Sequence, residues 1–395
     1  MKRPFTAHKQ VLDTLPEPTS DAWARSLELQ GLIARRLQSR PGAWMSFDEF
    51  MQMALYEPGL GYYAASERPI GHWSHDGSDF VTAPEMTVLF AQSVAQAVAQ
   101  VLRLSTPRVL EFGAGTGKLA ADLLNALGEA CHEYWIMEVS AALQAQQRNT
   151  LQKISPAYCH KVRWLTTLPD EFSGCILGNE VLDAMPVRCV EKTADGWLER
   201  GVSMDSAGQF MWALRPLIDV PACLPDSANE SYRTEISTAV TGFIYTLARC
   251  LKQGAALSFD YGFPQHELYH PQRSQGTLMC HYRHRAHNNP LVYVGLQDIT
   301  AHVNFTAVAE AALQAGAEHE GYTTQAHFLM NCGITQYLSA LPEVQRWREN
   351  TALHLLLSEA EMGELFKVIA FSQGLSEPVL GFGVGDRSHT LDGIS

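Results

Sequence analysis

A glycine-rich turn is the first place in this sequence where residue types and spacing could support chemistry. The segment VLEFGAGTG, residues 109–117, follows an apolar run and precedes a helix-forming run. Glycines let the backbone approach a ligand closely and adopt positive φ. The turn after the first strand of a doubly wound sheet is also a common ligand position. The segment therefore predicts a small-molecule site, with a ligand-free tight turn as the alternative.

The spacing of these glycines argues against two nucleotide-binding motifs. A dinucleotide fingerprint needs GxGxxG, and a Walker phosphate loop needs GxxxxGK followed by Ser or Thr. This chain has GAGTGK, which is GxGxG, and it carries an acid, Glu111, two residues before the first glycine. A dehydrogenase is therefore disfavoured.

A second acid, Glu138, ends the next apolar run in YWIMEVS. An acid at a strand tip can accept both hydroxyls of a ribose in charge-assisted hydrogen bonds. The alternative is an acid that caps the helix after it. The position of Glu138 after the second expected strand favours the ribose role.

Polar residues also follow the fourth apolar run, in GNEVLDAMPV. Carboxylates at Glu180 and Asp183 could hold a guanidinium in its planar fork geometry, and aligning an acceptor nitrogen for in-line attack would supply much of the rate. Asp183 could instead cap a helical turn. Upstream, the segment TAPE could close over a cofactor as a lid, or Thr82 and Glu85 could form a helix capping box.

Two downstream segments are polar as well. Gln297, Asp298 and His302 in LQDITAHVNF could line a substrate cleft, although a capping Asp298 and an ordinary histidine are the alternatives. The segment HYRHRAH, residues 281–287, has no convincing metal-ligand spacing. We expect a solvated basic loop there and no metal site.

Helix signals dominate the N-terminal part. Near-helical apolar spacing predicts a helix over 21–39 with Ser20 or Asp21 as its cap. The segment SFDE predicts a second helix from Ser46, with Glu49 completing a capping box and an end before Pro58. Residues 57–85 predict a long functional loop. A helix from Met86 to about Leu104 follows.

Strands and helices then alternate, which predicts an α/β fold with a mostly parallel, Rossmann-like sheet. The expected strands are RVLEF, EYWIMEV, VRWLTTL, GCILGNEV and AALSFDYG, with EHEGYTTQ and LFKVIAFSQ as candidates for the last two. An antiparallel β-meander and a helix over about 227–252 interrupt the alternation. We expect a flexible tail (1–20), an N-terminal helical region with a lid loop (21–105), and a main domain (106–395) with an inserted subdomain at about 187–252.

The composition of the chain narrows the classes of partner that it could bind. The 395-residue chain has a net charge of −13, so it gains little from phosphate neutralisation and nucleic acid is a poor partner. It has no apolar run of about 18 residues, which argues against a membrane span. Its eight cysteines form no CxxC pair, as expected for reduced thiols in a cytoplasmic protein. A homodimer is compatible with the sequence, with the N-terminal helices and the meander as candidate contact surfaces.

Taken together, several segments resemble the MidA-like S-adenosylmethionine (SAM)-dependent methyltransferases, a family whose mitochondrial members are protein arginine methyltransferases that help assemble respiratory complex I. The matching segments run in family order from about residue 46 to 385: EPGLGYY, DFVTAPE, LEFGAGTGKLAADLL, GNEVLDAMPV, SFDYGF, GTLMCHYRHR, QDITAHVNF and GELFKVIAFSQG. Departures from the family pattern are Ser78, Leu296 and Asn304.

The resemblance implies a class I methyltransferase sheet with SAM as its cofactor. The glycine turn, the tip of the second strand, the TAPE segment and the NEVLDAMP segment would face cofactor and substrate. The expected cofactor-binding residues are Glu111, Gly113, Ala114, Gly115, Gly117, Glu138, Val139, Asn179, Thr82 and Pro84. The expected catalytic residues are Glu180, Asp183 and Glu85.

The resemblance favours a protein substrate methylated at arginine. Two other functions stay open at this point. One is methylation of a small molecule or lipid, which a cavity enclosed by the long aromatic loop and the meander would favour. The other is a SAM-binding assembly factor that acts by contact with little catalysis.

Overall fold

The computed structural model describes residues 15–65, 82–225 and 229–393, and the chain divides into two units. One unit comprises Met1–Phe80, Ala184–Val240 and His266–His302, and the other comprises Val81–Asp183, Thr241–Gln265 and Val303–Ser395. The second unit takes in the helix that precedes the first parallel strand, whereas the sequence predicts that helix as part of the N-terminal region. The first unit takes in the segment around residues 281–287.

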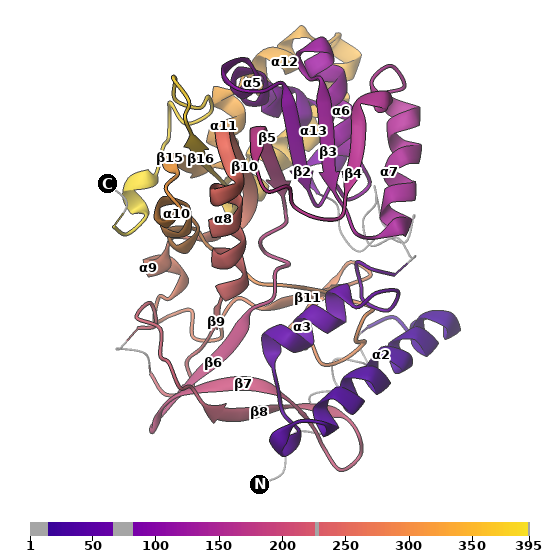
Figure 1. Ribbon diagram of the computed structural model, residues 1–395, viewed down its shortest axis with the longest axis vertical. Helices are drawn as coiled ribbons and strands as arrows, with labels where there is room; N and C mark the ends of the chain where they lie inside the picture. Colours follow the sequence, from indigo (N-terminus) through magenta and orange to yellow (C-terminus); the bar gives the residue numbers. More distant parts are fainter. Residues whose placement is uncertain (1–14, 66–81, 226–228, 394–395) are drawn as a thin grey trace. The chain divides into compact units, whose positions relative to one another are not determined.

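The second unit is built on a sheet with the strand order β15-β16-β10-β5-β2-β3-β4. Strands β4, β3, β2, β5 and β10 are parallel, and β16 runs antiparallel to both β10 and β15. Figure 1 shows β5, β2, β3 and β4 side by side. All seven expected strands are confirmed: β2 Arg108–Phe112, β3 Glu133–Met137, β4 Val162–Leu165, β5 Phe172–Asn179, β10 Leu251–Phe263, β15 Glu318–Thr324 and β16 Phe366–Gln373. A short strand, β14 (Val303–Asn304), also pairs with β10.

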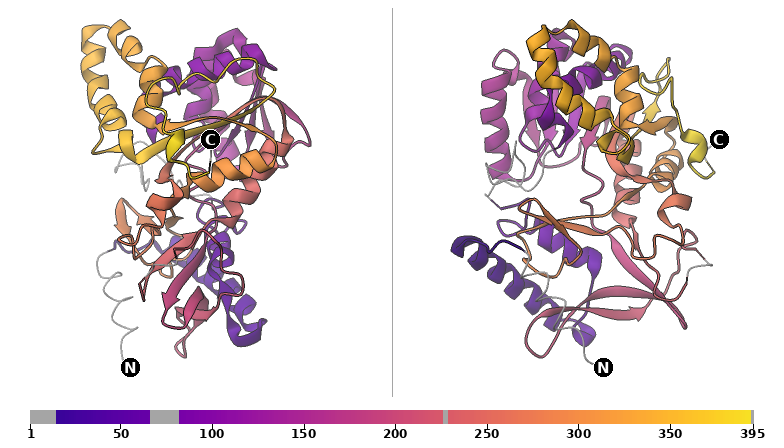
Figure 2. Two further views of the ribbon diagram at one scale, coloured as in Figure 1. Left: turned by 90° about the vertical axis from the view of Figure 1, so that its left-hand side faces the viewer. Right: turned by 180° about the vertical axis from the view of Figure 1, so that it is seen from behind.

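Helices cover both faces of this sheet. Alternate strand residues such as Val109, Leu177 and Leu257 share one core with α5, α6, α7 and the C-terminal helices, and α12 lies against α5 in Figure 2. On the other face, Phe112 packs edge-on against Phe243 of α8. The helices are α4 Ala83–Met86, α5 Val88–Leu104, α6 Lys118–Leu127, α7 Ala141–Ile154, α8 Thr238–Cys250, α10 Phe305–Gln314, α11 Gln325–Asn331, α12 Ile334–Ala340, α13 Glu343–Leu357 and α14 Met362–Leu365, with 3-10 turns η2 Gly128–Ala130, η3 Cys159–Lys161 and η4 Ser388–Thr390.

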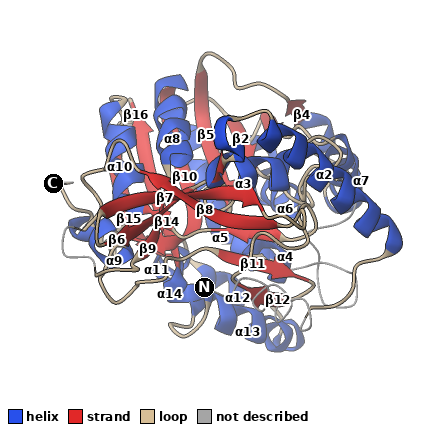
Figure 3. Ribbon diagram, turned by 90° about the horizontal axis from the view of Figure 1, so that it is seen from below, coloured by secondary structure: helices blue, strands red, loops and turns tan. Residues whose placement is uncertain are grey.

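The first unit combines helices with two antiparallel sheets. Its larger sheet has the order β1-β7-β6-β9 with β8 paired to β7, and its smaller sheet has the order β12-β11-β13. Helix α3 packs its aromatic face on the larger sheet, with Phe47 against Trp212 and Phe50 against Phe210 (Figure 3). The elements are α2 Ser20–Gln38, η1 Pro41–Ala43, β1 Met45–Ser46, α3 Phe47–Tyr56, β6 Arg188–Thr193, β7 Gly196–Met204, β8 Phe210–Pro216, β9 Arg233–Ile236, β11 Met279–Tyr282, β12 Arg285–His287 and β13 Asp298–Thr300, and α9 Gln265–Leu268 lies at the boundary.

No helix within the described ranges has both the length and the apolar character that crossing a membrane requires.

Several expected helix starts were wrong in detail. Thr19, rather than Ser20 or Asp21, caps α2 by accepting a hydrogen bond from the Ala22 N–H. Ser46 precedes α3, but its side chain makes no capping bond, and the Glu49 carboxylate pairs with Arg40 instead. The helix expected over about 227–252 is the shorter α8, because part of that segment forms strand β9. An ion pair and a strand pairing from elsewhere in the chain overrode these local signals.

A contact between two glycines sets the closest approach of β5 and β10. Gly254 has φ +139°, and a Cβ placed there would lie 1.8 Å from the Gly174 carbonyl oxygen. Gly254→Ala should therefore lower the free energy of unfolding by about 2–3 kcal/mol, since backbone must move to admit the methyl group. Chemical denaturation measures this.

Gly242→Ala is the matched control, because a Cβ at Gly242 in α8 meets nothing within 4 Å. We expect it to leave stability unchanged or raise it slightly, since alanine favours helix. Equal unfolding midpoints for the two variants would contradict the close-approach argument.

Candidate functional site

The glycine turn joins β2 to α6 and needs glycine for two reasons. Gly113, Gly115 and Gly117 all have positive φ, at 63°, 50° and 84°. A Cβ on Gly113 would lie 2.9 Å from the Val181 side chain, and one on Gly117 would lie 3.0 Å from the Gln147 Cα. Side chains at these two positions would therefore strain the backbone and collide with neighbouring segments. The turn ends at Gly117, which is the N-cap of α6.

Glu111 points from β2 into the core rather than toward the turn. It is 2% exposed, and its Oε2 accepts a hydrogen bond of 2.7 Å from the hydroxyl of Tyr134 on β3. Burial raises the pKa of Glu111 to about 7, and the tyrosine hydrogen bond opposes this shift only partly. The role of Glu111 in cofactor binding stays a prediction, and in this structure its carboxyl group contacts Tyr134.

Glu138 lies just beyond the end of β3, where its carboxylate is held by neutral donors. Its Oε1 accepts the Ser140 N–H at 2.8 Å, and its Oε2 accepts the Gln147 Nε2 at 3.2 Å. Burial raises the pKa of Glu138, while these hydrogen bonds lower it. The neighbouring Val139 leaves an apolar side chain 75% exposed. A fixed acceptor beside an exposed apolar side chain suits a ligand with hydroxyls next to a ring.

The TAPE segment lies against the glycine turn. Thr82, Pro84 and Glu85 are buried, and Glu85 Oε1 accepts a hydrogen bond from the Thr116 hydroxyl. The capping box expected here does not form, because the Thr82 side chain makes no cap bond and its carbonyl accepts the Glu85 N–H instead. Residues 66–81 of the expected lid loop, including Ser78, lie outside the described residues.

An acidic turn follows β5. Asn179 donates from Nδ2 to Glu180 Oε1 at 3.1 Å, and Glu180 itself has a left-handed φ of 53°. The Glu180 N–H donates to the Phe259 carbonyl at 2.8 Å, so β10 holds the backbone of the turn. The Asn179 Oδ1 is buried and has no hydrogen-bond partner among the described residues. A buried acceptor of this kind indicates a water or ligand donor at the strand end.

Asp260, on β10, holds the backbone of this turn and was not among the residues predicted from the sequence. It is fully buried in the last part of β10, and its Oδ2 accepts the N–H groups of Val181 at 3.1 Å and Leu182 at 2.8 Å. Burial and then the charge of Asp183 raise the pKa of Asp260 well above its ordinary range. The signal that singled out Glu138, an acid at a strand tip, is present in AALSFDYG and could have found it.

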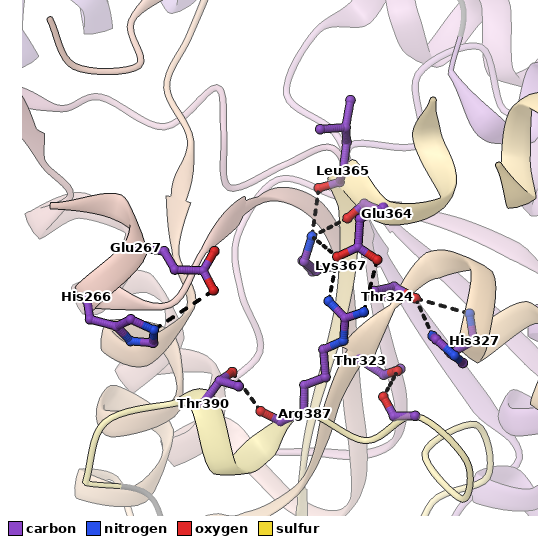
Figure 4. A network of polar contacts seen from close by, with 11 residues as sticks. His266, Glu267, Thr323, Thr324, His327, Glu364, Leu365, Lys367, Arg387 and Thr390 are labelled. Carbon is purple, nitrogen blue, oxygen red and sulfur yellow. Dashed lines mark hydrogen bonds and ion pairs between the residues drawn. The ribbon is translucent and has the colours of Figure 1, made fainter. Parts of the chain in front are cut away.

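Two cationic side chains, Lys367 and Arg387, lie on β16 and on the segment after it (Figure 4). Lys367 stands opposite Asp260 in the β10–β16 register, but its Nζ donates to the carbonyls of Glu364 and Leu365. Arg387 makes two bonds to the Glu364 carboxylate. These cations are therefore directed toward the start of β16.

The remaining predicted polar residues belong to the first unit. Asp298 opens β13 and accepts a hydrogen bond of 2.8 Å from the Tyr63 hydroxyl, so it does not cap a helix. Gln297 is fully buried and donates to the Asn289 carbonyl at 3.2 Å. His302 is in the same unit and donates its N–H to Thr277. All three residues lie in the first unit, whereas the glycine turn lies in the second.

The segment 281–287 was wrongly expected to be a loop. It forms the hairpin β11–β12, with Arg283 and His284 at positive φ in its turn. Burial lowers the pKa of His281, as it does for His287. No group of three or more His, Cys, Asp or Glu side chains able to hold a metal occurs among the described residues.

Comparison with known proteins bears on what such a site binds. Residues 89–323 match the model of a family of S-adenosyl-L-methionine-dependent methyltransferases. A crystal structure from Burkholderia thailandensis, bound to S-adenosyl-homocysteine, is 52% identical and covers 96% of this chain and all of its own, with a TM-score of 0.93. The chain is also similar to the mitochondrial protein arginine methyltransferase NDUFAF7 of Xenopus tropicalis (27% identity, 89% of this chain and 87% of the relative) and of Homo sapiens (26%, 82% and 78%).

The buried Glu111 should give the protein a distinctive pH dependence. Its folded pKa of about 7 exceeds the ordinary 4.5, so its protonated form favours folding; that stability is complete below pH 4.5 and is lost as pH rises through 7. Glu111→Gln keeps an acceptor for Tyr134 without the charge. Between pH 5 and 8, wild-type unfolding free energy should fall relative to the variant by about 2.5 kcal/mol. Urea titrations at several pH values test this, and parallel pH profiles would refute it.

Proposed function

The chain belongs to a family of S-adenosyl-L-methionine-dependent methyltransferases, and from this premise we propose that it methylates a protein, at an arginine side chain. The acidic turn around Glu180 carries the proposal, because a guanidinium is always charged and fits carboxylate pairs. The names of the mitochondrial relatives support the same acceptor, at about 26% identity. What we propose is the identity of the methyl acceptor.

The residues at the strand ends fit the cofactor. The glycine turn admits close backbone approach, and Glu138 presents a carboxylate suited to ribose hydroxyls. Val139 offers an exposed apolar surface for the adenine ring, and the buried Asn179 Oδ1 offers an acceptor for the amino group of the methionine part. When bound, SAM supplies an electrophilic methyl group on a sulfonium sulfur.

We assign guanidinium binding to Glu180 and Asp183. The carboxylates hold the acceptor's charge on the nitrogens that they contact, which directs electron density to the remaining nitrogen. That nitrogen forms the new bond to the methyl carbon as the carbon–sulfur bond breaks, and it then loses one proton. The products are S-adenosylhomocysteine and a methylated arginine. Positioning for this in-line attack is the main contribution of the protein.

Glu85 takes a different role in this proposal from the catalytic one first expected. Its bond to the Thr116 hydroxyl ties the TAPE segment to the glycine turn. We therefore assign to Glu85 the docking of that segment against the cofactor-binding turn.

The acceptor can be identified by labelling. Extract from a strain that lacks this gene is incubated with the purified protein and methyl-labelled SAM. We expect labelled protein bands whose acid hydrolysates contain methylarginine. Label that appears only in small molecules or lipids, or protein label on another amino acid, would overturn the arginine proposal. SAM binding without any transfer would point to an assembly factor.

Glu180→Gln should separate acceptor binding from cofactor binding. Loss of a carboxylate that holds a buried charge lowers methyl transfer by about 100-fold. The dissociation constant for SAM, measured by calorimetry, should change less than about twofold.

Glu359→Gln serves as the control, because it removes an equal charge from an exposed position of the same unit. It should leave transfer unchanged. Wild-type transfer by Glu180→Gln would refute the role of Glu180, and a parallel loss in Glu359→Gln would indicate a general effect of charge.

A further inference from the structure

Gln147 is a fully buried amide in the middle of α7 that reaches both parts of the cofactor-binding edge. Its Nε2 donates to the Gly115 carbonyl at 3.1 Å and to Glu138 Oε2 at 3.2 Å. Its Oε1 accepts the indole N–H of Trp164, on β4, at 2.8 Å. One side chain thus contacts the glycine turn, the acid after β3 and the neighbouring strand.

The orientation of this amide follows from its partners. An indole N–H can only donate, and a carbonyl can only accept. Rotating the amide by 180° would set its NH2 against the Trp164 N–H and its oxygen against the Gly115 carbonyl and Glu138 carboxylate. The indole is itself covered by the guanidinium of Arg148, 4.2 Å from the ring centroid. The donor end of Gln147 is therefore held toward the cofactor-binding turn.

The two hydrogen bonds that Gln147 Nε2 donates affect different groups of the cofactor-binding edge. The bond to Gly115 orients a carbonyl inside a turn whose φ of 50° only glycine adopts readily. The bond to Glu138 fixes the second oxygen of a carboxylate whose first oxygen is held by Ser140. This second bond also lowers the pKa of Glu138 against the effect of burial, so it favours the charged form. The charged carboxylate is the better acceptor for hydroxyl groups.

We propose that Gln147 is a positioning residue that couples the glycine turn to Glu138 and thereby sets the affinity for SAM. This rests on the proposed roles of the glycine turn and Glu138 in cofactor binding, and it is independent of the identity of the methyl acceptor. Gln147 does not contact the reacting atoms. Its effect passes through the turn and the acid that it holds.

Calorimetry with SAM and S-adenosylhomocysteine on the full-length chain tests the proposal. Gln147→Met keeps the length of the side chain and removes both donated bonds, so both dissociation constants should rise about tenfold or more. The loss should grow as pH is lowered, because removal of the donor raises the pKa of Glu138 and protonation removes the acceptor. A general packing defect would not produce this pH dependence.

Gln147→Glu keeps the acceptor for Trp164 but turns an oxygen toward Glu138 and the Gly115 carbonyl. It should bind SAM more weakly than Gln147→Met at pH 8, and it tests the proposal if the methionine variant fails to fold. Gln152→Met is the matched control, because it makes the same change at an exposed position of α7. It should change the dissociation constant for SAM less than about twofold.

A double-mutant cycle decides whether Gln147 acts through Glu138. In a Glu138→Gln background, Gln147→Met should weaken SAM binding less than about threefold, because part of its target is gone. Wild-type affinity in Gln147→Met, or a full tenfold loss in the Glu138→Gln background, would overturn the proposal. Wild-type protein that binds no SAM would refute the cofactor site itself, and a negative labelling experiment would refute only the arginine acceptor.

Discussion

Parallel pairing of β2, β3, β5 and β10 is the constraint on which the rest of the site depends. Parallel strands all end at the same edge of the sheet, so the segments that follow them meet there even when they are far apart in the chain. The glycine turn follows β2, Glu138 follows β3, the acidic turn follows β5, and Asp260 lies in the last part of β10. A shift in register between β5 and β10 would move Asp260 away from the N–H groups that it accepts.

The close approach that keeps this register is also a matter of small residues. Gly174 and Gly254 bring β5 and β10 together at their beginnings, and Gly113 lets the turn after β2 pass the Val181 side chain. Close backbone approach therefore serves strand packing at the beginnings of β5 and β10 and the glycine turn at the opposite edge of the sheet. Side chains at these positions would separate the strands before they affected any ligand.

Two kinds of acid occur in the second unit, and they differ in what holds them. Glu364 is matched by the guanidinium of Arg387, as expected for a pair that only connects segments. Glu138 and Asp260 accept hydrogen bonds from backbone and amide N–H groups. Neutral donors fix the direction of the Glu138 carboxylate without cancelling its charge, so Glu138 can still attract a hydroxyl group. Burial and the charge of Asp183 instead favour the neutral form of Asp260. Glu111 accepts its bond from Tyr134 inside the core, where burial favours its neutral form.

Much of the fold was readable from local pattern. Most of the seven expected strands are apolar runs bounded by turn residues, with the more polar β15 as an exception, and the glycine turn and Glu138 follow two of them. The predictions that failed rested on local sequence signals, which contacts with distant residues overrode. Glu49 pairs with Arg40 instead of closing a capping box, Glu85 accepts a hydrogen bond from Thr116, and β11 pairs with the distant strand β13 as well as with β12. Asp260 had the same strand-tip signal as Glu138 and was overlooked.

The sequence by itself determined which segments carry the functional residues: which turn is rich in glycine and which strands end in acids. It also carries the resemblance that points to SAM. These are properties of residue type and short spacing, which local backbone preferences are enough to express. Only the tertiary structure decided the direction of each polar side chain. Glu111 and Glu138 end neighbouring strands, yet one turns into the core and the other is held at the edge by Gln147, a residue in mid-helix with no motif to mark it. Hydrogen bonds between distant segments make that choice, because burial leaves each polar group only the partners that packing brings within reach.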